Sequence, residues 1–166
     1  MAPRLRGGDK SECMTLPREP VRIVVGPIDT AAETAFVAAA SGVGAVVTFS
    51  GICRADEKGD KISALTLEHY PGMAEQEIGK HVEEAQRRWP LLGVRVIHRV
   101  GRIEPGETIV FVVTASAHRE AAFQAAEFIM DYLKTSAPFW KRTEGGGKET
   151  WIEANEKDDK AAARWK

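Results

Sequence analysis

The sequence predicts an α+β protein in which helices pack on a mixed or largely antiparallel sheet. Apolar runs of strand length alternate with amphipathic stretches of helix length, and short charged or Gly-Pro segments separate them. The expected order is β-α-β-β-α-β-β-α-β. A chain of 166 residues with a hydrophobic fraction of 43% is long and apolar enough for one domain with a real core.

The N-terminal half contains three expected strands and one helix. The run VRIVV at residues 21–25 is strand-like and closes at a Gly-Pro pair. A short helix is expected over residues 30–40, because its start has capping-box spacing and Ser-Gly follows it. Residues 43–52 are β-branched and nearly all apolar, which predicts a central strand buried on both faces. Residues 62–69 alternate between apolar and polar, which predicts a strand that pairs back on 43–52.

The C-terminal half continues with two helices and three strands. A charged amphipathic helix is expected to end near Trp89-Pro90. Residues 94–100 alternate as a half-buried strand does, and residues 108–115 form another buried apolar run. The next helix has apolar residues at i, i+3, i+4, i+7 and i+11 from Ala122 onward. A last short strand is expected at residues 150–153.

Composition and charge exclude several classes of function. A formal net charge of −1 argues against a general polyanion binder, because nucleic-acid-binding domains are usually clearly basic. Cys13, Cys53 and the four histidines lack the spacing of a metal site, so we expect no metal. The sequence has no glycine-rich phosphate loop either, and we expect no cofactor. No apolar run is long enough to span a membrane. The first twenty residues are polar and lack the apolar stretch of a secretory signal, so we expect a disordered tail. Two cysteines far apart in the sequence do not indicate a disulfide framework, so we expect a reduced, cytoplasmic setting.

The most informative segment runs from Ser116 to Arg142. We expect Ser116 to cap a helix that opens with His118-Arg119 and ends at Lys134, and Lys141 follows an aromatic pair. Cations at both ends of one apolar helix indicate an anionic ligand, because a helix start normally prefers acidic residues. The plainer alternatives stay open: a lysine in the last turn stabilises a helix by itself, and a lysine after aromatic residues is often a surface residue.

Geometry restricts how these cations can act together. His118 and Lys134 are sixteen residues apart, so a straight helix separates them by roughly 24 Å and points them to nearly opposite sides. One small ligand therefore cannot contact both within one subunit. Either they serve different sites, or two antiparallel subunits form two equal pockets in which one helix start faces the partner's helix end.

Several motifs resemble the family of large, catalytic subunits of molybdopterin synthase. The most specific are LEHYPGM at residues 67–73 and FIMDYLK…APFWK at 128–141, SAHR at 116–119 also matches, and the match covers about residues 21–155. The resemblance implies an α/β-hammerhead-type fold with an added α+β subdomain. It also implies that cyclic pyranopterin monophosphate becomes molybdopterin by insertion of two dithiolene sulfurs. The sulfur arrives as a thiocarboxylate on the C-terminal Gly-Gly of a small ubiquitin-like subunit, and a homodimer of large subunits lies within a heterotetramer.

The same resemblance implies a role for each site residue. Lys134 and Lys141 match the family's catalytic lysines. The substrate-binding positions are Arg54, Phe49, Met130 and, from the neighbouring large subunit, His118 and Arg119. One position departs from the pattern: Asn155 stands where some relatives carry a basic residue, so that contact with phosphate or pterin is not carried over.

The expected organisation is a disordered tail at residues 1–20, the family domain at 21–155 and a charged tail at 156–166. No part of the chain resembles a ubiquitin-like domain, so the sulfur carrier is expected to come from a separate chain. The alternative function is a non-catalytic dimeric module that binds pterin or nucleotide phosphates with the same cations. A nucleic-acid binder gains little support from a chain of net charge −1.

Overall fold

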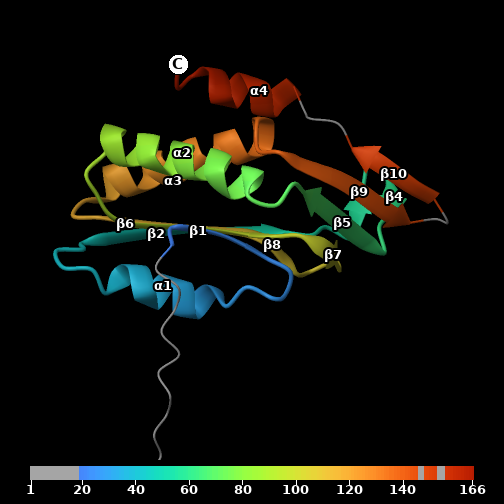
Figure 1. The fold of residues 1–166 in the computed structure, drawn as a ribbon, viewed down its shortest axis with the longest axis horizontal. Helices are drawn as coiled ribbons and strands as arrows, with labels where there is room; N and C mark the ends of the chain where they lie inside the picture. Colours follow the sequence, from blue (N-terminus) through green and yellow to red (C-terminus); the bar gives the residue numbers. More distant parts are fainter. Residues whose placement is uncertain (1–18, 146–147, 153–155) are drawn as a thin grey trace, which may run out of the picture.

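The computed structural model describes residues 19–145, 148–152 and 156–166, and Figure 1 shows helices on both faces of one sheet with a second sheet at its side. The α+β class with a mixed sheet is confirmed. In chain order the elements are β1 (Val21–Val24), α1 (Thr30–Ala38), β2 (Ala45–Ile52), β3 (Asp56–Glu57), β4 (Asp60–Lys61), β5 (Ala64–His69), α2 (Met73–Arg88), β6 (Leu91–Arg99), β7 (Gly101–Ile103), β8 (Thr108–Ser116), α3 (Arg119–Thr135), β9 (Phe139–Gly145), β10 (Lys148–Ile152) and α4 (Glu156–Ala163).

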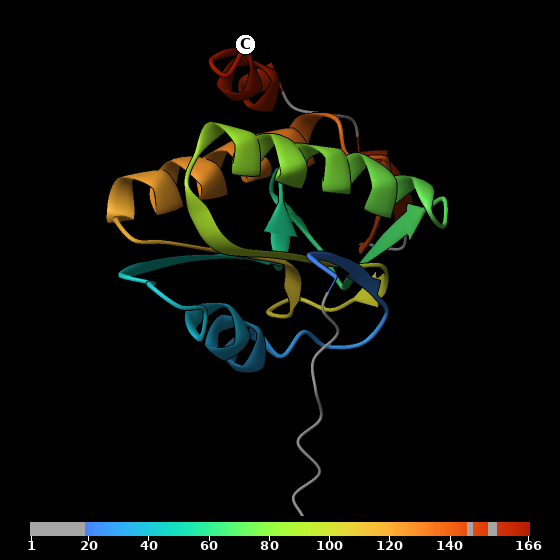
Figure 2. The same ribbon diagram turned by 60° about the vertical axis from the view of Figure 1, so that its left-hand side comes forward.

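The central sheet has the strand order β1-β6-β8-β2. β1 pairs in parallel with β6, and the other neighbours are antiparallel. Helices α2 and α3 cover one face and α1 covers the other (Figures 1 and 2). Along β8, Val110 and Val112 pack toward α2 and α3, whereas Phe111 and Val113 pack toward α1. Alternate side chains thus enter different cores, so both faces of this strand are buried, as the sequence predicts.

The second sheet has the order β10-β9-β5-β7 and is antiparallel. The chain passes from β6 of the central sheet into β7 of this sheet at Gly101, whose φ of 82° lies in the region that favours glycine. Leu65 and Leu67 of β5 pack with Val100 and Ile103 in a small core of their own. This sheet is an α+β addition to the central layer, and its junction with the central sheet lies near the end of α3 (Figure 1).

Three expectations about the strands are wrong. β2 is an edge strand rather than a central one, and its middle residues are exposed. β5 pairs with β7 and β9 rather than with β2. β6 is buried on both faces rather than half-buried, because α1 covers the face that carries Arg95. An apolar or alternating pattern indicates that a strand is covered, but it does not specify which element covers it.

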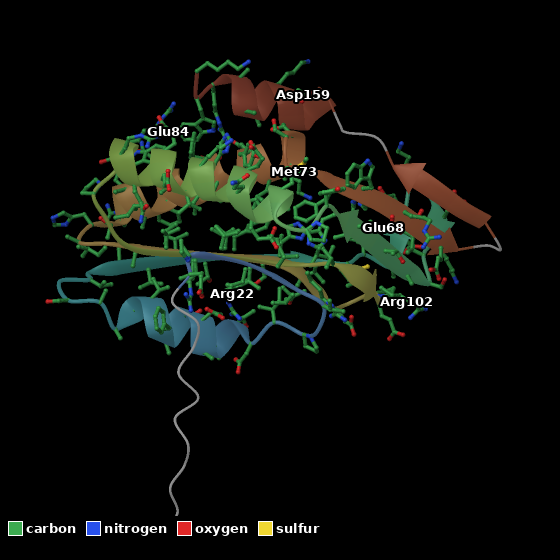
Figure 3. The ribbon with its side chains drawn as sticks, viewed as in Figure 1. Arg22, Glu68, Met73, Glu84, Arg102 and Asp159 are labelled. Carbon is green, nitrogen blue, oxygen red and sulfur yellow. The ribbon has the colours of Figure 1, made fainter. Side chains whose placement is uncertain are left out.

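A buried ionic cluster joins α1 to the central sheet. Arg95 is 1% exposed, and its Nε donates to Oε2 of Glu33 at 2.9 Å, while Arg22 pairs with the other carboxylate oxygen. Figure 3 shows Arg22 between α1 and the sheet. Burial lowers the pKa of both guanidinium groups from the ordinary value, so their charged forms depend on the carboxylate between them. Nη1 of Arg95 also donates to the carbonyl of Glu19 at 2.8 Å, which fixes the chain before β1.

The C-terminal segment packs on α3, although its composition indicates only a charged tail. The ring of Trp165 meets Trp89 and Phe128 edge-on, with centroid distances of 5.6 and 5.7 Å. Its Nε1 donates to Oδ2 of Asp131 at 2.6 Å, and Nη2 of Arg164 donates to the same oxygen at 2.7 Å. α4 therefore covers the outer side of α3 (Figure 1).

The buried cluster leads to a stability prediction. Glu33→Ala should lower the free energy of unfolding by about 3 kcal/mol or more, because it leaves two desolvated guanidinium groups without a counter-charge. Urea denaturation measures the change. The control is Glu104→Ala, which removes a carboxylate that is 62% exposed and should cost less than about 1 kcal/mol. Equal losses in the two variants would contradict a structural role for the cluster.

Candidate active site

A cavity of about 330 Å³ lies where the end of α3 meets both sheets. It contains four residues that the sequence analysis singles out: Arg54, Met130, Lys134 and Lys141. The rest of its wall combines apolar side chains with a few polar groups. These further lining residues are Gly51, Ile52, Glu57, Leu65, Leu67, His98, Ile109, Val110, Leu133, Thr135, Ala137 and Phe139.

The fold brings the three cations together from separate parts of the chain. Arg54 follows the end of β2, and Lys134 lies in the last turn of α3. The chain then reverses into β9. In this strand Lys141 pairs with Leu67 of β5. Because α3 runs alongside β2, the ends of both elements and the start of β9 meet at this one cavity.

An aromatic stack forms part of the cavity wall. The rings of His98 and Phe139 are 4.0 Å apart between centroids and nearly parallel. Nδ1 of His98 lies 3.0 Å from the carbonyl of Arg99, which can only accept, so this nitrogen carries the proton. Burial, reinforced by the positive charge of Lys134, lowers the pKa of His98 to about 4. The imidazole is therefore neutral at neutral pH and adds no charge to the cavity.

The charged groups of the cavity favour an anion. Against the cations Arg54, Lys134 and Lys141 stands the carboxylate of Glu57, whose Oε2 lies 3.7 Å from Nζ of Lys141. A concave site with a surplus of positive charge concentrates anionic ligands. Buried Cys53 lies beside this group, and burial raises the pKa of its thiol, so it stays protonated and is a poor nucleophile at neutral pH.

The other predicted site residues lie outside this cavity. His118 is at the N-cap position of α3 and Arg119 is its first residue, so both lie at the opposite end of the helix from Lys134. Phe49 is 39% exposed on the edge strand β2. The expectation that Ser116 caps α3 is wrong: Ser116 ends β8, and its hydroxyl donates to the carbonyl of Pro90 at 2.8 Å. Asn155 lies outside the described residues.

Sequence reasoning missed two polar groups of the cavity. Glu57 lies in a segment that looks like an ordinary charged turn, and nothing in the pattern distinguishes it from a solvent-exposed carboxylate. His98 lies in a strand that looks half-buried, so nothing in the pattern distinguishes it from a surface histidine. Among the described residues, no group of three or more His, Cys, Asp and Glu side chains is placed to hold a metal ion. No helix in the described ranges is long and apolar enough to cross a membrane.

Comparisons with known proteins agree on one family. A family model described as "MoaE protein" matches residues 23–136. The molybdopterin synthase catalytic subunit of Mesorhizobium japonicum is 60% identical over 152 residues, which cover 88% of this chain and 92% of that protein. The protein of the same name from Escherichia coli is 53% identical over 146 residues, which cover 87% and 97%.

Solved structures with the same fold carry related names. The structure of the molybdopterin biosynthesis MoaE protein from Burkholderia ambifaria gives a TM-score of 0.75 at 44% identity and covers 87% of this chain and 96% of that chain. The crystal structure of molybdopterin synthase from Staphylococcus aureus gives a TM-score of 0.74 at 30% identity and covers 79% and 95%.

The buried imidazole predicts a pH dependence of stability. The pKa of His98 is about 4 in the folded protein and 6.5 in the unfolded chain, so below pH 6.5 the unfolded chain binds a proton that the folded protein does not. The free energy of unfolding should therefore fall by up to about 3 kcal/mol as the pH drops from 6.5 to 4, with no contribution from His98 above that window.

Urea denaturation at a series of pH values measures this slope. His98→Gln removes the titrating group and should flatten the slope between pH 6.5 and 4, whatever its effect on stability at pH 7. Identical slopes in the two proteins would show that His98 is not the group responsible.

Proposed function

The chain belongs to the MoaE protein family, and we propose that it acts as the catalytic subunit of a molybdopterin synthase, an enzyme of molybdenum cofactor biosynthesis. The observation that carries this function is the convergence of Arg54, Lys134 and Lys141 on one cavity from three elements, with Arg54 just after β2, Lys134 in the last turn of α3 and Lys141 in β9. The volume of about 330 Å³ is at the lower end of the range for small-molecule sites, which suits the reacting ends of two molecules.

The proposed reaction is a sulfur transfer between two anions. The substrate is cyclic pyranopterin monophosphate, and the sulfur donor is the thiocarboxylate at the C-terminal Gly-Gly of a small ubiquitin-like subunit. Preformed cations reduce the repulsion between these anions and stabilise the charge that develops as sulfur attacks. Two sulfurs are inserted to complete the dithiolene, which makes the enzyme a sulfurtransferase.

Each cation has a proposed role in this scheme. Lys134 contacts the terminal carbonyl of the carrier's tail and assists acyl and proton transfer. Lys141 binds the pterin substrate and assists proton transfer, and Arg54 holds phosphate or pterin. Met130 contributes to the apolar part of the cavity wall, beside which the substrate is bound in this scheme.

The edge strand supports a homodimer that shares its sites. β2 and α3 start at the same end of the molecule, since the amide of Gly44 donates to the carbonyl of Ser116 at 3.0 Å. They also end together at the cavity. Two copies that meet antiparallel along β2 would therefore place His118 and Arg119 of one copy beside Lys134 of the other. Phe49 and Ile52 are exposed on this edge, and an apolar unpaired edge is a surface that a partner strand covers.

The disordered tail expected at residues 1–20 stays a proposal for residues 1–18, which lie outside the described residues, whereas the carbonyls of Glu19 and Pro20 accept hydrogen bonds from Arg95 and Val96. A cytoplasmic location remains a prediction from the sequence. The alternative, a non-catalytic binding module, uses the same cations without turnover. It fits the names of the relatives less well, because these are named as catalytic subunits. Release of molybdopterin from substrate and thiocarboxylated carrier separates the two functions directly.

Substitution of the central lysine tests the catalytic assignment. Lys134→Ala should reduce molybdopterin formation by about 100-fold or more, because the loss of one charge-stabilising group from an active site typically costs about that factor or more. The melting temperature should change little, since Lys134 is exposed at the end of α3. Lys80→Ala, at a lysine that is 62% exposed on α2, is the matched control and should keep full activity. Near-normal turnover in Lys134→Ala would remove this residue from the mechanism.

Mixed subunits test the shared site. Lys134→Ala and His118→Ala proteins should each be inactive, but a mixed dimer holds one pocket with both residues intact. Random exchange should restore about a quarter of wild-type activity, because about half of the dimers are mixed and each has one working site of two. If mass spectrometry confirms exchange and activity does not return, the two residues do not act in one pocket across the dimer.

A further inference from the structure

Glu57 is the carboxylate among the residues that line the cavity. Its Oε2 lies 3.7 Å from Nζ of Lys141, and the two side chains are 19% and 33% exposed. The ion pair is thus partly shielded from water. Glu57 therefore holds the place beside Lys141 that an incoming anion would take.

The hairpin that carries Glu57 is held by its backbone. β3 and β4 pair Asp56 with Lys61 and Glu57 with Asp60. The two residues between the strands, Lys58 and Gly59, have φ of 50° and 86°, as the tight turn of a two-residue hairpin requires. The hairpin therefore presents the carboxylate to the cavity without depending on the ion pair for its shape.

A carboxylate beside Lys141 acts against every anion that binds this lysine. Either the ligand displaces Glu57 from Lys141, or it stays close to a like charge, and both cost binding free energy. The cost is largest for a small anion that leaves the displaced carboxylate without a new partner, and it is smaller for a ligand whose donor groups pair with that carboxylate. A weak ligand such as free phosphate then needs a higher concentration to occupy the site. A ligand with several contacts remains bound, and its donor groups can pair with the displaced carboxylate.

We propose that Glu57 is a specificity-determining residue: an internal competitor for Lys141 that keeps the cavity clear of small free anions until a ligand with several contacts displaces it. The proposal rests on the charge and geometry of the cavity and goes beyond the proposed function. It adds a repulsive element to a site that otherwise selects by attraction alone.

The test is a titration of the isolated protein with inorganic phosphate at constant ionic strength, followed by calorimetry. Glu57→Gln should bind phosphate about three- to five-fold more tightly than the wild type, because a partly shielded ion pair contributes about that factor. Glu57→Asp keeps the charge and should stay within about two-fold of the wild type. The readout needs no turnover, so it decides the proposal whether or not the chain makes molybdopterin.

Two controls separate competition for Lys141 from a general change of charge. Asp56→Asn removes the same charge one residue earlier, on the opposite face of the hairpin and outside the cavity, and should leave phosphate affinity unchanged. In a Lys141→Gln background, Glu57→Gln should give no further gain. The proposal is overturned if Glu57→Gln binds phosphate no more tightly than the wild type. An equal gain in Asp56→Asn, or a gain that persists without Lys141, would overturn it as well.

Discussion

The straight course of α3 is the constraint on which the arrangement of charged residues depends. The helix has 17 residues, and its buried face packs small and branched side chains such as Ala122, Ala125 and Ile129 on the central sheet. At about 1.5 Å per residue, its ends are separated by a distance that no side-chain movement can close. The sheet holds both ends in place, so Lys134 and Arg119 belong to opposite edges of one molecule. A site that uses both must be completed by a second copy of the chain.

The cavity forms where the chain reverses after this helix. The stack of Phe139 on His98 holds the start of β9 against β6, and the pairing of β9 with β5 then sets the position of Lys141. A neutral imidazole suits this wall, because a protonated ring would repel the cations and the ligand they attract. The low pKa of His98 is therefore a consequence of the same burial and charge that make the cavity suitable for an anion.

The buried charges under α1 and the partly exposed charges at the cavity have different roles. Under α1, the carboxylate of Glu33 is enclosed between two arginines, so the cluster contributes to the fold and offers nothing to a ligand. At the cavity, the cations are partly exposed and exceed the carboxylate charge in number. The first arrangement balances charge internally. The second leaves an imbalance that a ligand corrects, and Glu57 sets how large that imbalance is.

Local patterns in the sequence determined α1, α2 and α3, most strands and the segment that carries His118, Lys134 and Lys141, because periodicity depends on neighbouring residues. The helix length alone also separated the cations into two groups. Only the tertiary structure decided that β2 lies at an edge, that β5 pairs with β9, and that Glu57 and His98 face the cavity. Strand pairing joins residues that are far apart in the chain, so local patterns do not determine it. An alternating pattern indicates that one side of a strand is buried, but it does not indicate which element buries it. Arg95 and His98 show the limit most clearly: their polarity indicates solvent, whereas the fold buries them beside Glu33 and Phe139.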